Sequence, residues 1–326
     1  MSTPVPIELQ APDLSRWASG NTGTPYVWHF DSGQAGPRAM VQALTHGNEI
    51  CGAIALDELL GCQASWRPRR GSLTLAFGNI AAYAHWDPAE PDRSRYVDED
   101  LNRVWADEVL QGPRDSVELR RARALRPFVD AADLLLDIHS MREPCTPLMV
   151  CGTTGRGGDK GAALSRQLQV PPLLLIDTGH PAGLRLIERG AFADPLHARR
   201  AVLIECGQHW ERAAADVARQ TLLRFLGHSG VLEPGFIEVR LRPFSRTPPP
   251  RQRLLRVTEA VVARSTQFRF VREFRGLELI ARAGELVATD GAHQVRAPYD
   301  DTVLVMPGMT NLKAGMTTVR LGRYED

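Results

Sequence analysis

Over roughly the first 230 positions, short apolar runs rich in branched side chains alternate with longer stretches of helical character. The runs are apolar on both faces, which predicts strands of a mainly parallel sheet flanked by helices, an α/β fold. The predicted strands are Tyr26–Phe30, Arg38–Thr45, Leu73–Phe77, Asp133–His139, Leu148–Cys151, Leu173–Asp177 and Ala201–Cys206. The predicted helices lie near Glu49–Leu60, Val117–Ala131, Lys160–Leu168 and Glu211–Leu226. In such a fold the active site lies at the carboxyl ends of the strands.

The pattern changes after Gly227, where Glu233-Pro234-Gly235 interrupts the chain and no long helical periodicity follows. Short alternating runs separated by glycine and proline then predict small strands. These runs are Phe268–Val271, Gly276–Ala281 and Thr302–Met306. We therefore predict two domains, an α/β domain over residues 1–231 and a small β-rich C-terminal domain over residues 232–326.

The length of the chain supports this division, because 326 residues exceed the usual size of one compact core. The net charge is +1 and the arginines are interleaved with acids, so we expect no nucleic-acid partner. The first residues have neither the basic start nor the apolar segment of a secretory signal, and no run approaches the roughly 18 apolar residues of a membrane span. We expect a cytoplasmic protein without a membrane partner, whose five scattered cysteines are reduced core residues.

Candidate metal ligands follow two of the predicted strands. In His46-Gly47-Asn48-Glu49 the glycine permits a tight turn, and the three-residue offset can bring His46 and Glu49 to one metal, although this short pattern also arises by chance. His139 closes another strand, and Asp137 shares its face, where a carboxylate can set the imidazole tautomer. Backbone groups alone could also satisfy a histidine at a strand end. Together the three residues predict a zinc site with an open position for water, which indicates hydrolysis.

A polar segment between the two histidines contains Arg95, Asn102 and Arg103. Guanidinium groups bind carboxylates bidentately and stabilise developing oxyanions, and an asparagine amide adds directional hydrogen bonds. These residues are therefore candidates for substrate binding. A surface loop held by local ion pairs is the alternative.

Glu205 follows the strongly apolar run Val202–Ile204 at the end of a predicted strand. Burying an acid there is costly unless the carboxylate has a function, and a general base beside a metal site would be one. The alternative is an edge carboxylate paired with Arg199 or Arg200.

Four motifs together resemble the succinylglutamate desuccinylase/aspartoacylase family, within the wider group of zinc carboxypeptidase-like enzymes. They are His46-Gly47-Asn48-Glu49, Asp100-Leu101-Asn102-Arg103, Asp137-Ile138-His139 and Ile204-Glu205-Cys206-Gly207. The resemblance spans residues about 40 to 210, and the β-rich tail also looks similar. It implies a zinc carboxypeptidase-like catalytic domain that binds one Zn²⁺ per chain through His46, Glu49 and His139. It also implies that Glu205 is the general base, which activates water and then protonates the leaving amine.

The same resemblance implies roles for the other candidates. Arg95 would stabilise the oxyanion, Asn102 and Arg103 would hold a substrate carboxylate, and Asp100 would orient His46. Tyr299, in the tail, would contribute to the pocket.

The chain departs from the family shortly before the glutamate, where the family's substrate-reading tyrosine and arginine correspond to positions near Ala191 and Pro195. Four arginines lie nearby, but none matches in spacing: Arg185, Arg189, Arg199 and Arg200. The resemblance therefore implies zinc-dependent hydrolysis of the amide bond of a small N-acyl amino acid, without identifying the acyl group. A metallocarboxypeptidase acting on peptides and a non-catalytic binding protein on the same scaffold are the alternatives. Assembly into a homo-oligomer also stays open.

Overall fold

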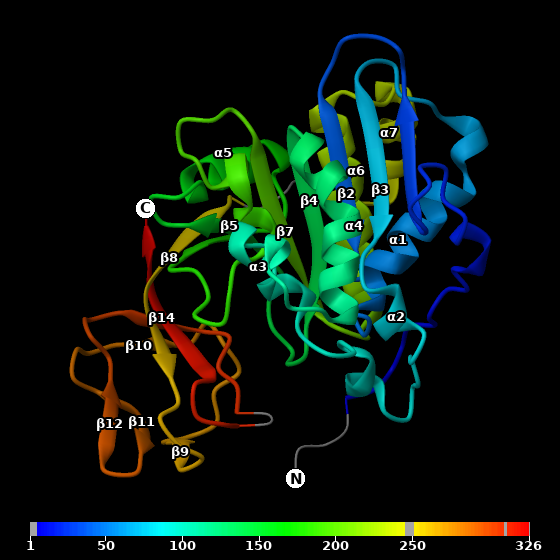
Figure 1. The fold of residues 1–326 in the computed structure, drawn as a ribbon. Helices are drawn as coiled ribbons and strands as arrows, with labels where there is room; N and C mark the ends of the chain where they lie inside the picture. Colours follow the sequence, from blue (N-terminus) through cyan, green and yellow to red (C-terminus); the bar gives the residue numbers. More distant parts are fainter. Residues whose placement is uncertain (1–4, 245–250, 310–311, 326) are drawn as a thin grey trace.

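A mixed sheet of eleven strands forms the centre of the computed structural model, which describes residues 5–244, 251–309 and 312–325 (Figure 1). The strand order is β1-β3-β2-β4-β7-β5-β6-β8-β14-β13-β10. The strands are β1 (Val27–Asp31), β2 (Arg38–Ala43), β3 (Ser72–Phe77), β4 (Leu134–Met141), β5 (Leu148–Thr153), β6 (Leu173–Asp177), β7 (Arg200–Gln208), β8 (Arg253–Val262), β10 (Leu279–Ile280), β13 (Thr302–Val305) and β14 (Thr317–Glu325). All seven strands predicted for the α/β part are present.

Strands β3, β2, β4 and β7 run parallel to one another, as do β5, β6 and β8. The two parallel groups meet where β5 pairs antiparallel with β7. Parallel strands buried on both faces have hydrophobic residues at nearly every position, which is why these runs showed little alternation. The predicted α/β class with a mainly parallel sheet is confirmed.

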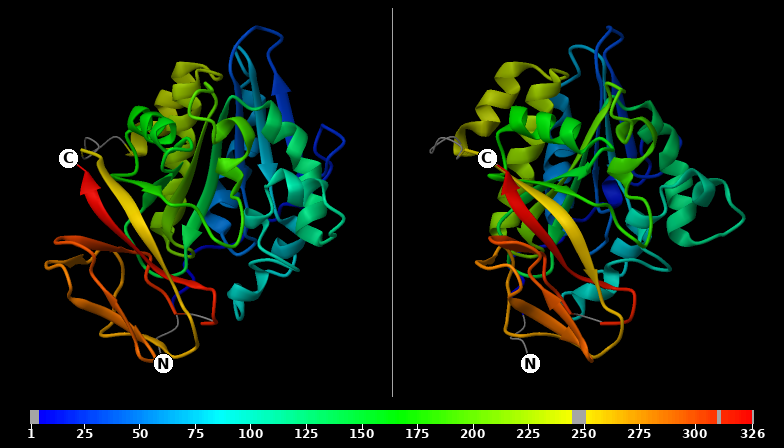
Figure 2. Two further views of the ribbon diagram at one scale, coloured as in Figure 1. Left: turned by 60° about the vertical axis from the view of Figure 1, so that its left-hand side comes forward. Right: turned by 90° about the vertical axis from the view of Figure 1, so that its left-hand side faces the viewer.

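Helices cover both faces of this sheet (Figure 2). Helices α1, α5, α6 and α7 pack on one face and α4 packs on the other. In β4, for example, Leu136 faces the first group and Leu135 faces α4, because successive strand residues point to opposite faces. The helices are α1 (Ile50–Gly61), α2 (Ile80–Tyr83), α3 (Asp107–Gln111), α4 (Val117–Ala131), α5 (Gly158–Leu168), α6 (Arg212–Ser229) and α7 (Pro234–Leu241). The four helices predicted from periodicity are α1, α4, α5 and α6.

The C-terminal residues form the predicted β-rich region, which has its own apolar core. Strands β8 and β14 form its long antiparallel pair and also extend the main sheet beside β6. A separate three-stranded antiparallel sheet contains β9 (Phe268–Phe270), β11 (Leu286–Asp290) and β12 (His293–Arg296). Helix α7 lies beyond the predicted boundary at residue 232, yet its Ile237 packs into the core beneath α6. That boundary stays a prediction.

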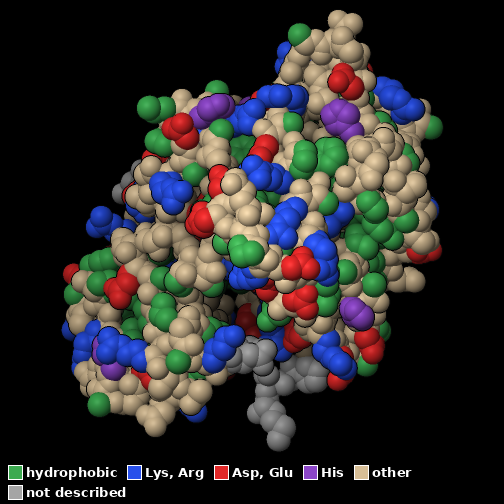
Figure 3. Space-filling view, in the orientation of Figure 1, with side chains coloured by type: hydrophobic (Ala, Val, Ile, Leu, Met, Phe, Trp, Pro, Cys, Tyr) green, Lys and Arg blue, Asp and Glu red, His purple; other side chains and the backbone are tan. Residues whose placement is uncertain are grey.

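The surface carries basic and acidic side chains interspersed with one another on the face drawn in Figure 3. All five cysteines are free thiols, and Cys51, Cys151 and Cys206 are buried. Within the described ranges, no helix has the length and apolar character needed to cross a membrane.

Candidate metal and active site

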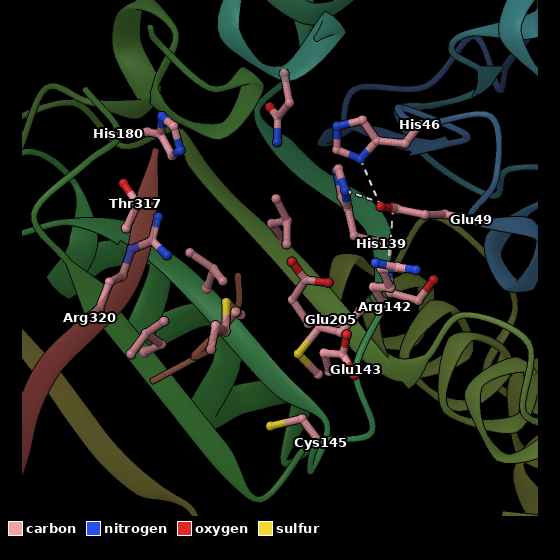
Figure 4. A pocket seen from close by; sticks show the side chains of 18 of the residues that line it. His46, Glu49, His139, Arg142, Glu143, Cys145, His180, Glu205, Thr317 and Arg320 are labelled. Atoms are coloured by element: carbon pink, nitrogen blue, oxygen red, sulfur yellow. Dashed lines mark hydrogen bonds and ion pairs between the residues drawn. The ribbon is translucent and has the colours of Figure 1, made fainter. Parts of the chain in front are cut away.

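A cavity of about 310 Å³ lies where β2, β4 and β7 carry the candidate residues (Figure 4). His46 follows the end of β2, whereas His139 and Glu205 lie near the carboxyl ends of β4 and β7. Since these three strands are parallel, their carboxyl ends meet at one edge of the sheet. The side chains therefore come together as the strand pattern predicted.

His46, Glu49 and His139 form a buried group that could hold a metal ion, with one ligand atom of each within 4.8 Å of the others. The Nδ1 atom of His46 lies 2.7 Å from Oε1 of Glu49, and the Nδ1 atom of His139 lies 2.9 Å from Oε2. Glu49 is placed by the start of α1, where it is the N-cap residue. Gly47 is required in the preceding turn, because a Cβ there would lie 2.3 Å from the backbone oxygen of Ser94.

A carboxylate holds the other nitrogen of each imidazole. Asp100 Oδ1 lies 2.8 Å from His46 Nε2, and Asp137 Oδ2 lies 2.7 Å from His139 Nε2. Each carboxylate favours the tautomer with the proton on Nε2, which leaves the lone pair of Nδ1 directed toward Glu49. The predicted positions of Asp100 and Asp137 behind the two histidines therefore agree with the structure.

Glu205 lies in register with His139 in the β4–β7 ladder, and its side chain points into the cavity (Figure 4). Its Oε2 is buried and accepts no hydrogen bond from the described residues. Burial raises the pKa of Glu205 to about 8, with His139 opposing this shift and Glu49 adding to it. Among the described residues Glu205 forms no ion pair with Arg199 or Arg200, the alternative partners; its Oε2 is unpaired, and Arg199 lies 3.7 Å from Asp133.

Arg95 lies beside the metal group. Its Nη1 is 3.6 Å from Oε1 of Glu49, and its Nη2 is 3.4 Å from Oδ2 of Asp100. The side chain is 37% exposed, and Arg95 lines the cavity. Its cation therefore faces the space next to the three candidate ligands.

Asn102 and Arg103 line the cavity from a short 3-10 turn that Asp100 caps, since the Asp100 carboxylate accepts the backbone N–H of Asn102 at 2.8 Å. The Asn102 side-chain oxygen accepts the backbone N–H of Leu186 at 2.9 Å. Burial lowers the pKa of Arg103 to about 10, Asp100 opposes this shift, and the Arg95 cation adds to it. The structure thus brings Arg95, Asn102 and Arg103 to the cavity that also contains the candidate metal ligands.

A model of the succinylglutamate desuccinylase/aspartoacylase catalytic domain matches residues 35–228, which is more than half of the chain. The chain belongs to this family. Its members are deacylases, a class of hydrolases, so the family is one of enzymes. The matched residues contain the metal group, Glu205 and the three cationic and amide residues described above. The β-rich C-terminal strands lie outside the match.

Individual relatives are similar to this chain over different extents. The probable aspartoacylase of Parasynechococcus marenigrum (strain WH8102) is 36% identical over 101 residues, which are 29% of this chain and 31% of that protein. The alignment thus spans about a third of that relative. The succinylglutamate desuccinylase structure from Vibrio parahaemolyticus covers 93% of this chain and 87% of its own, with a TM-score of 0.67 and 15% identity. The one from Vibrio cholerae covers 93% and 88%, with a TM-score of 0.63 and 17% identity. At these identities the two structures support the fold alone.

Tyr299 is not among the residues that line the cavity. Its hydroxyl lies 2.7 Å from Oγ1 of Thr258, and the guanidinium of Arg323 lies 5.7 Å from its ring. The predicted contribution of this tyrosine to the pocket therefore has no support in the structure. Tyr299 lies in the turn between β12 and β13, where its hydroxyl contacts Thr258 of β8 rather than the cavity.

Other residues of the tail do reach the cavity and were not predicted. They are Met306, Pro307, Gly308, Met316, Thr317 and Arg320, with Arg275 at the rim. His180 and Arg185, from the segment after β6, also line it. Arg185 could be noticed in the sequence only as an unmatched arginine, and no motif identified Arg320.

Arg185 is held by two carboxylates. Its guanidinium donates to Asp177 at 2.7 and 2.8 Å and to Glu188 at 2.8 and 3.0 Å. These ion pairs raise the pKa of Arg185 above its usual range, although burial opposes the shift. The charge of Arg185 is therefore compensated within the protein, and the residue supports the cavity wall.

Proposed function

We propose that this protein hydrolyses the amide bond of a small N-acyl amino acid with the help of a bound zinc ion. The observation that carries the proposal is the His46-Glu49-His139 group beside Glu205, whose buried Oε2 has no hydrogen-bond partner among the described residues. Membership of a deacylase family supports the same reaction class.

The donor set suits zinc. Two imidazole nitrogens and one carboxylate are the ligands of many catalytic zinc sites, which keep a further position open. Two carboxylates orient the histidines from behind, as is common for metal-binding imidazoles. When bound, zinc supplies Lewis-acid polarisation of a carbonyl group and makes water more acidic.

Glu205 is the proposed general base. It takes a proton from the attacking water and then gives it to the departing amine, so that one carboxylate serves both steps. Its pKa of about 8 applies to the metal-free protein, and a nearby divalent cation would lower that pKa because it favours the carboxylate. The anion that accepts the proton would then be available at neutral pH.

Arg95 is proposed to stabilise the negative charge that develops on the carbonyl oxygen. Its guanidinium is already held between Glu49 and Asp100, so little rearrangement is needed as the charge forms. Asn102 and Arg103 are proposed to hold a carboxylate of the substrate, because an amide and a guanidinium can both donate to it.

The size of the cavity favours small substrates. At about 310 Å³ it lies at the lower end of the roughly 300–1,000 Å³ that is usual for ligand pockets. Met306 and Met316 of the C-terminal region form part of its wall, which restricts the space for a peptide. A metallocarboxypeptidase is therefore the weaker alternative. A cytoplasmic location and homo-oligomeric assembly stay predictions from the sequence.

Zinc-loaded protein should be assayed on N-acetyl, N-succinyl and N-formyl amino acids, with a panel of short peptides for comparison. We expect turnover of at least one acylated amino acid and a lower kcat/KM for every peptide. A Glu205→Gln variant should bind one zinc yet turn over about 10²- to 10⁴-fold more slowly. Glu238→Gln, an exposed change on α7, is the matched control. Parental turnover by zinc-bound Glu205→Gln would contradict the mechanism, and hydrolysis of peptides alone would contradict the proposed substrate.

A further inference from the structure

The cavity has a second charged wall, opposite the metal group. Figure 4 shows His180 and Arg320 on one side of the cavity, with His46, Glu49 and His139 on the other and Glu205 between them. Arg320 comes from β14, and His180 comes from the segment after β6. Neither has a place in the mechanism above, and Arg320 lies outside the family match.

The guanidinium of Arg320 has no hydrogen-bond partner among the described residues. Its Nε is buried. The nearest carboxylate oxygen, Oδ2 of Asp177, is 3.9 Å from that Nε and accepts a hydrogen bond from Arg185 at 2.7 Å. The other oxygen of Asp177 accepts from Arg185 at 2.8 Å and from the backbone of Gly179 at 2.9 Å. Asp177 is therefore already satisfied without Arg320.

His180 adds a neutral hydrogen-bond donor to this wall. Its Nδ1 accepts the backbone N–H of Ala182 at 3.1 Å, so the proton of the neutral ring is on Nε2. Burial, together with the nearby cations of Arg103 and Arg320, lowers the pKa of His180 to about 3, so the ring is uncharged at neutral pH. Among the described residues, no group accepts a hydrogen bond from Nε2.

Arg103 completes the wall. Its closest carboxylate oxygen belongs to Asp100, 3.9 Å from Nη2, and the Arg320 cation disfavours its charged form. Two incompletely compensated cations and one free N–H donor therefore face the same space. An anion with at least two acceptor oxygens would satisfy the donors and relieve the repulsion between the cations.

We propose that Arg320 and His180 join Arg103 in binding the substrate carboxylate, at the end of the substrate remote from the amide that is cleaved. The inference rests on the proposed function for the identity of the substrate, and it extends that function by assigning specificity to β14. The C-terminal region would thus select acylated amino acids that carry a carboxylate on the wall opposite the metal. The competing explanation is that Arg320 only supports the fold through Asp177.

A binding experiment on the zinc-free protein tests this wall independently of catalysis. Isothermal titration of the parent protein with succinate should detect binding, and Arg320→Gln should weaken it about 10- to 100-fold, as expected for a lost charge-assisted contact. His180→Phe removes the second donor without touching Asp177 and should weaken binding less, about 10-fold. Arg323→Gln, an arginine change on the same strand, should leave binding unchanged. Thermal unfolding identifies any variant that fails to fold.

Turnover provides the second arm. Two substrates are compared that differ only in a remote carboxylate and its neutral amide isostere. Arg320→Gln should lower kcat/KM about 100-fold for the acidic substrate and less than about threefold for the neutral one. An equal loss on both substrates would indicate a structural role and overturn the proposal, as would succinate binding that is absent in the parent or unchanged in both variants. If no acylated amino acid is hydrolysed, the proposed function fails, but the titrations still decide whether this wall binds carboxylates.

Discussion

Replacing Glu205 by glutamine should stabilise the metal-free protein, although it should slow the proposed reaction about 10²- to 10⁴-fold. The carboxylate lines the cavity, its Oε2 is buried without a hydrogen-bond partner among the described residues, and Glu49 and Asp137 add negative charge nearby. Glutamine has nearly the same shape and carries no charge. The substitution therefore removes an electrostatic cost without removing a hydrogen bond to Oε2.

The size of the effect follows from the pKa of Glu205, which rises from 4.5 in the unfolded chain to about 8 in the metal-free fold. The folded parent binds the Glu205 proton more tightly than the unfolded chain does, so protonation adds to its free energy of unfolding. This contribution is complete below pH 4.5 and is lost as the pH rises through 8. At about 1.36 kcal/mol per pH unit, the variant should gain about 1 kcal/mol over the parent at pH 5 and about 4 kcal/mol at pH 8.

Glu118 provides a contrasting control, because it is fully buried but fully hydrogen bonded. Its Oε1 accepts from the Asn79 amide at 2.9 Å and the Val97 backbone at 2.7 Å, and its Oε2 accepts from the backbones of Asp98 and Glu99 at 3.0 and 3.2 Å. Glutamine at this position would place its NH₂ donor against N–H groups that now donate to the carboxylate. Glu118→Gln should therefore lower the free energy of unfolding by about 2–4 kcal/mol at both pH values.

The measurement is urea unfolding of the parent and both variants in chelator, at pH 5 and pH 8. Equal m-values are needed before the free energies are compared. The reasoning is refuted if Glu205→Gln is less stable than the parent at pH 8, or if its advantage does not grow with pH. Added zinc should reduce the advantage of Glu205→Gln, because the cation stabilises the parental carboxylate.

Three further predictions concern the metal group and the tail. Asp100→Asn weakens the hydrogen bond to His46 Nε2 and should lower zinc affinity about 10- to 100-fold in a chelator competition assay. Unchanged affinity would show that Asp100 does not orient His46 for the metal. Tyr299→Phe should change KM less than about threefold, because its hydroxyl bonds Thr258 away from the cavity, and a larger rise would restore the role predicted from the sequence. Zinc at about a thousandfold above its Kd should raise the free energy of unfolding by about 4 kcal/mol, and a melting temperature insensitive to zinc would contradict specific binding.

Local rules made the metal group predictable. His46 and His139 follow apolar runs whose length and composition indicate parallel strands, and such strands bring their carboxyl ends to one edge. The helix start at Glu49 also follows from the tight turn at Gly47. Glu205 shares this origin, although β7 continues beyond it to Gln208, so that Glu205 is paired with His139 within the ladder rather than at its end. These positions depend on short segments of sequence, which is why they could be inferred.

The tail was less predictable because its contribution depends on long-range pairing. Arg320 reaches the cavity because β14 pairs with β8 and β8 in turn extends the sheet beside β6. No local pattern around Arg320 encodes that path. Helix α7 was missed for a local reason, because the pair Pro234-Gly235 indicated a loop. Pro234 lies instead in the first turn of the helix, where proline is well tolerated.

The unsatisfied atoms of the cavity limit what its ligand can be. Of the residues lining it, Glu205, Thr317 and Arg320 have buried side-chain atoms without a hydrogen-bond partner among the described residues. Such atoms are rare in folded proteins and cost about 1–3 kcal/mol each, so a ligand that satisfies them gains affinity. A simple dicarboxylate could satisfy Arg320 while Glu205 is protonated, as it is at neutral pH in the metal-free protein with its pKa of about 8, but it would repel the Glu205 anion. A molecule with a proton donor at one end and a carboxylate at the other suits both walls, and an N-acyl amino acid has these groups in its amide N–H and its acid.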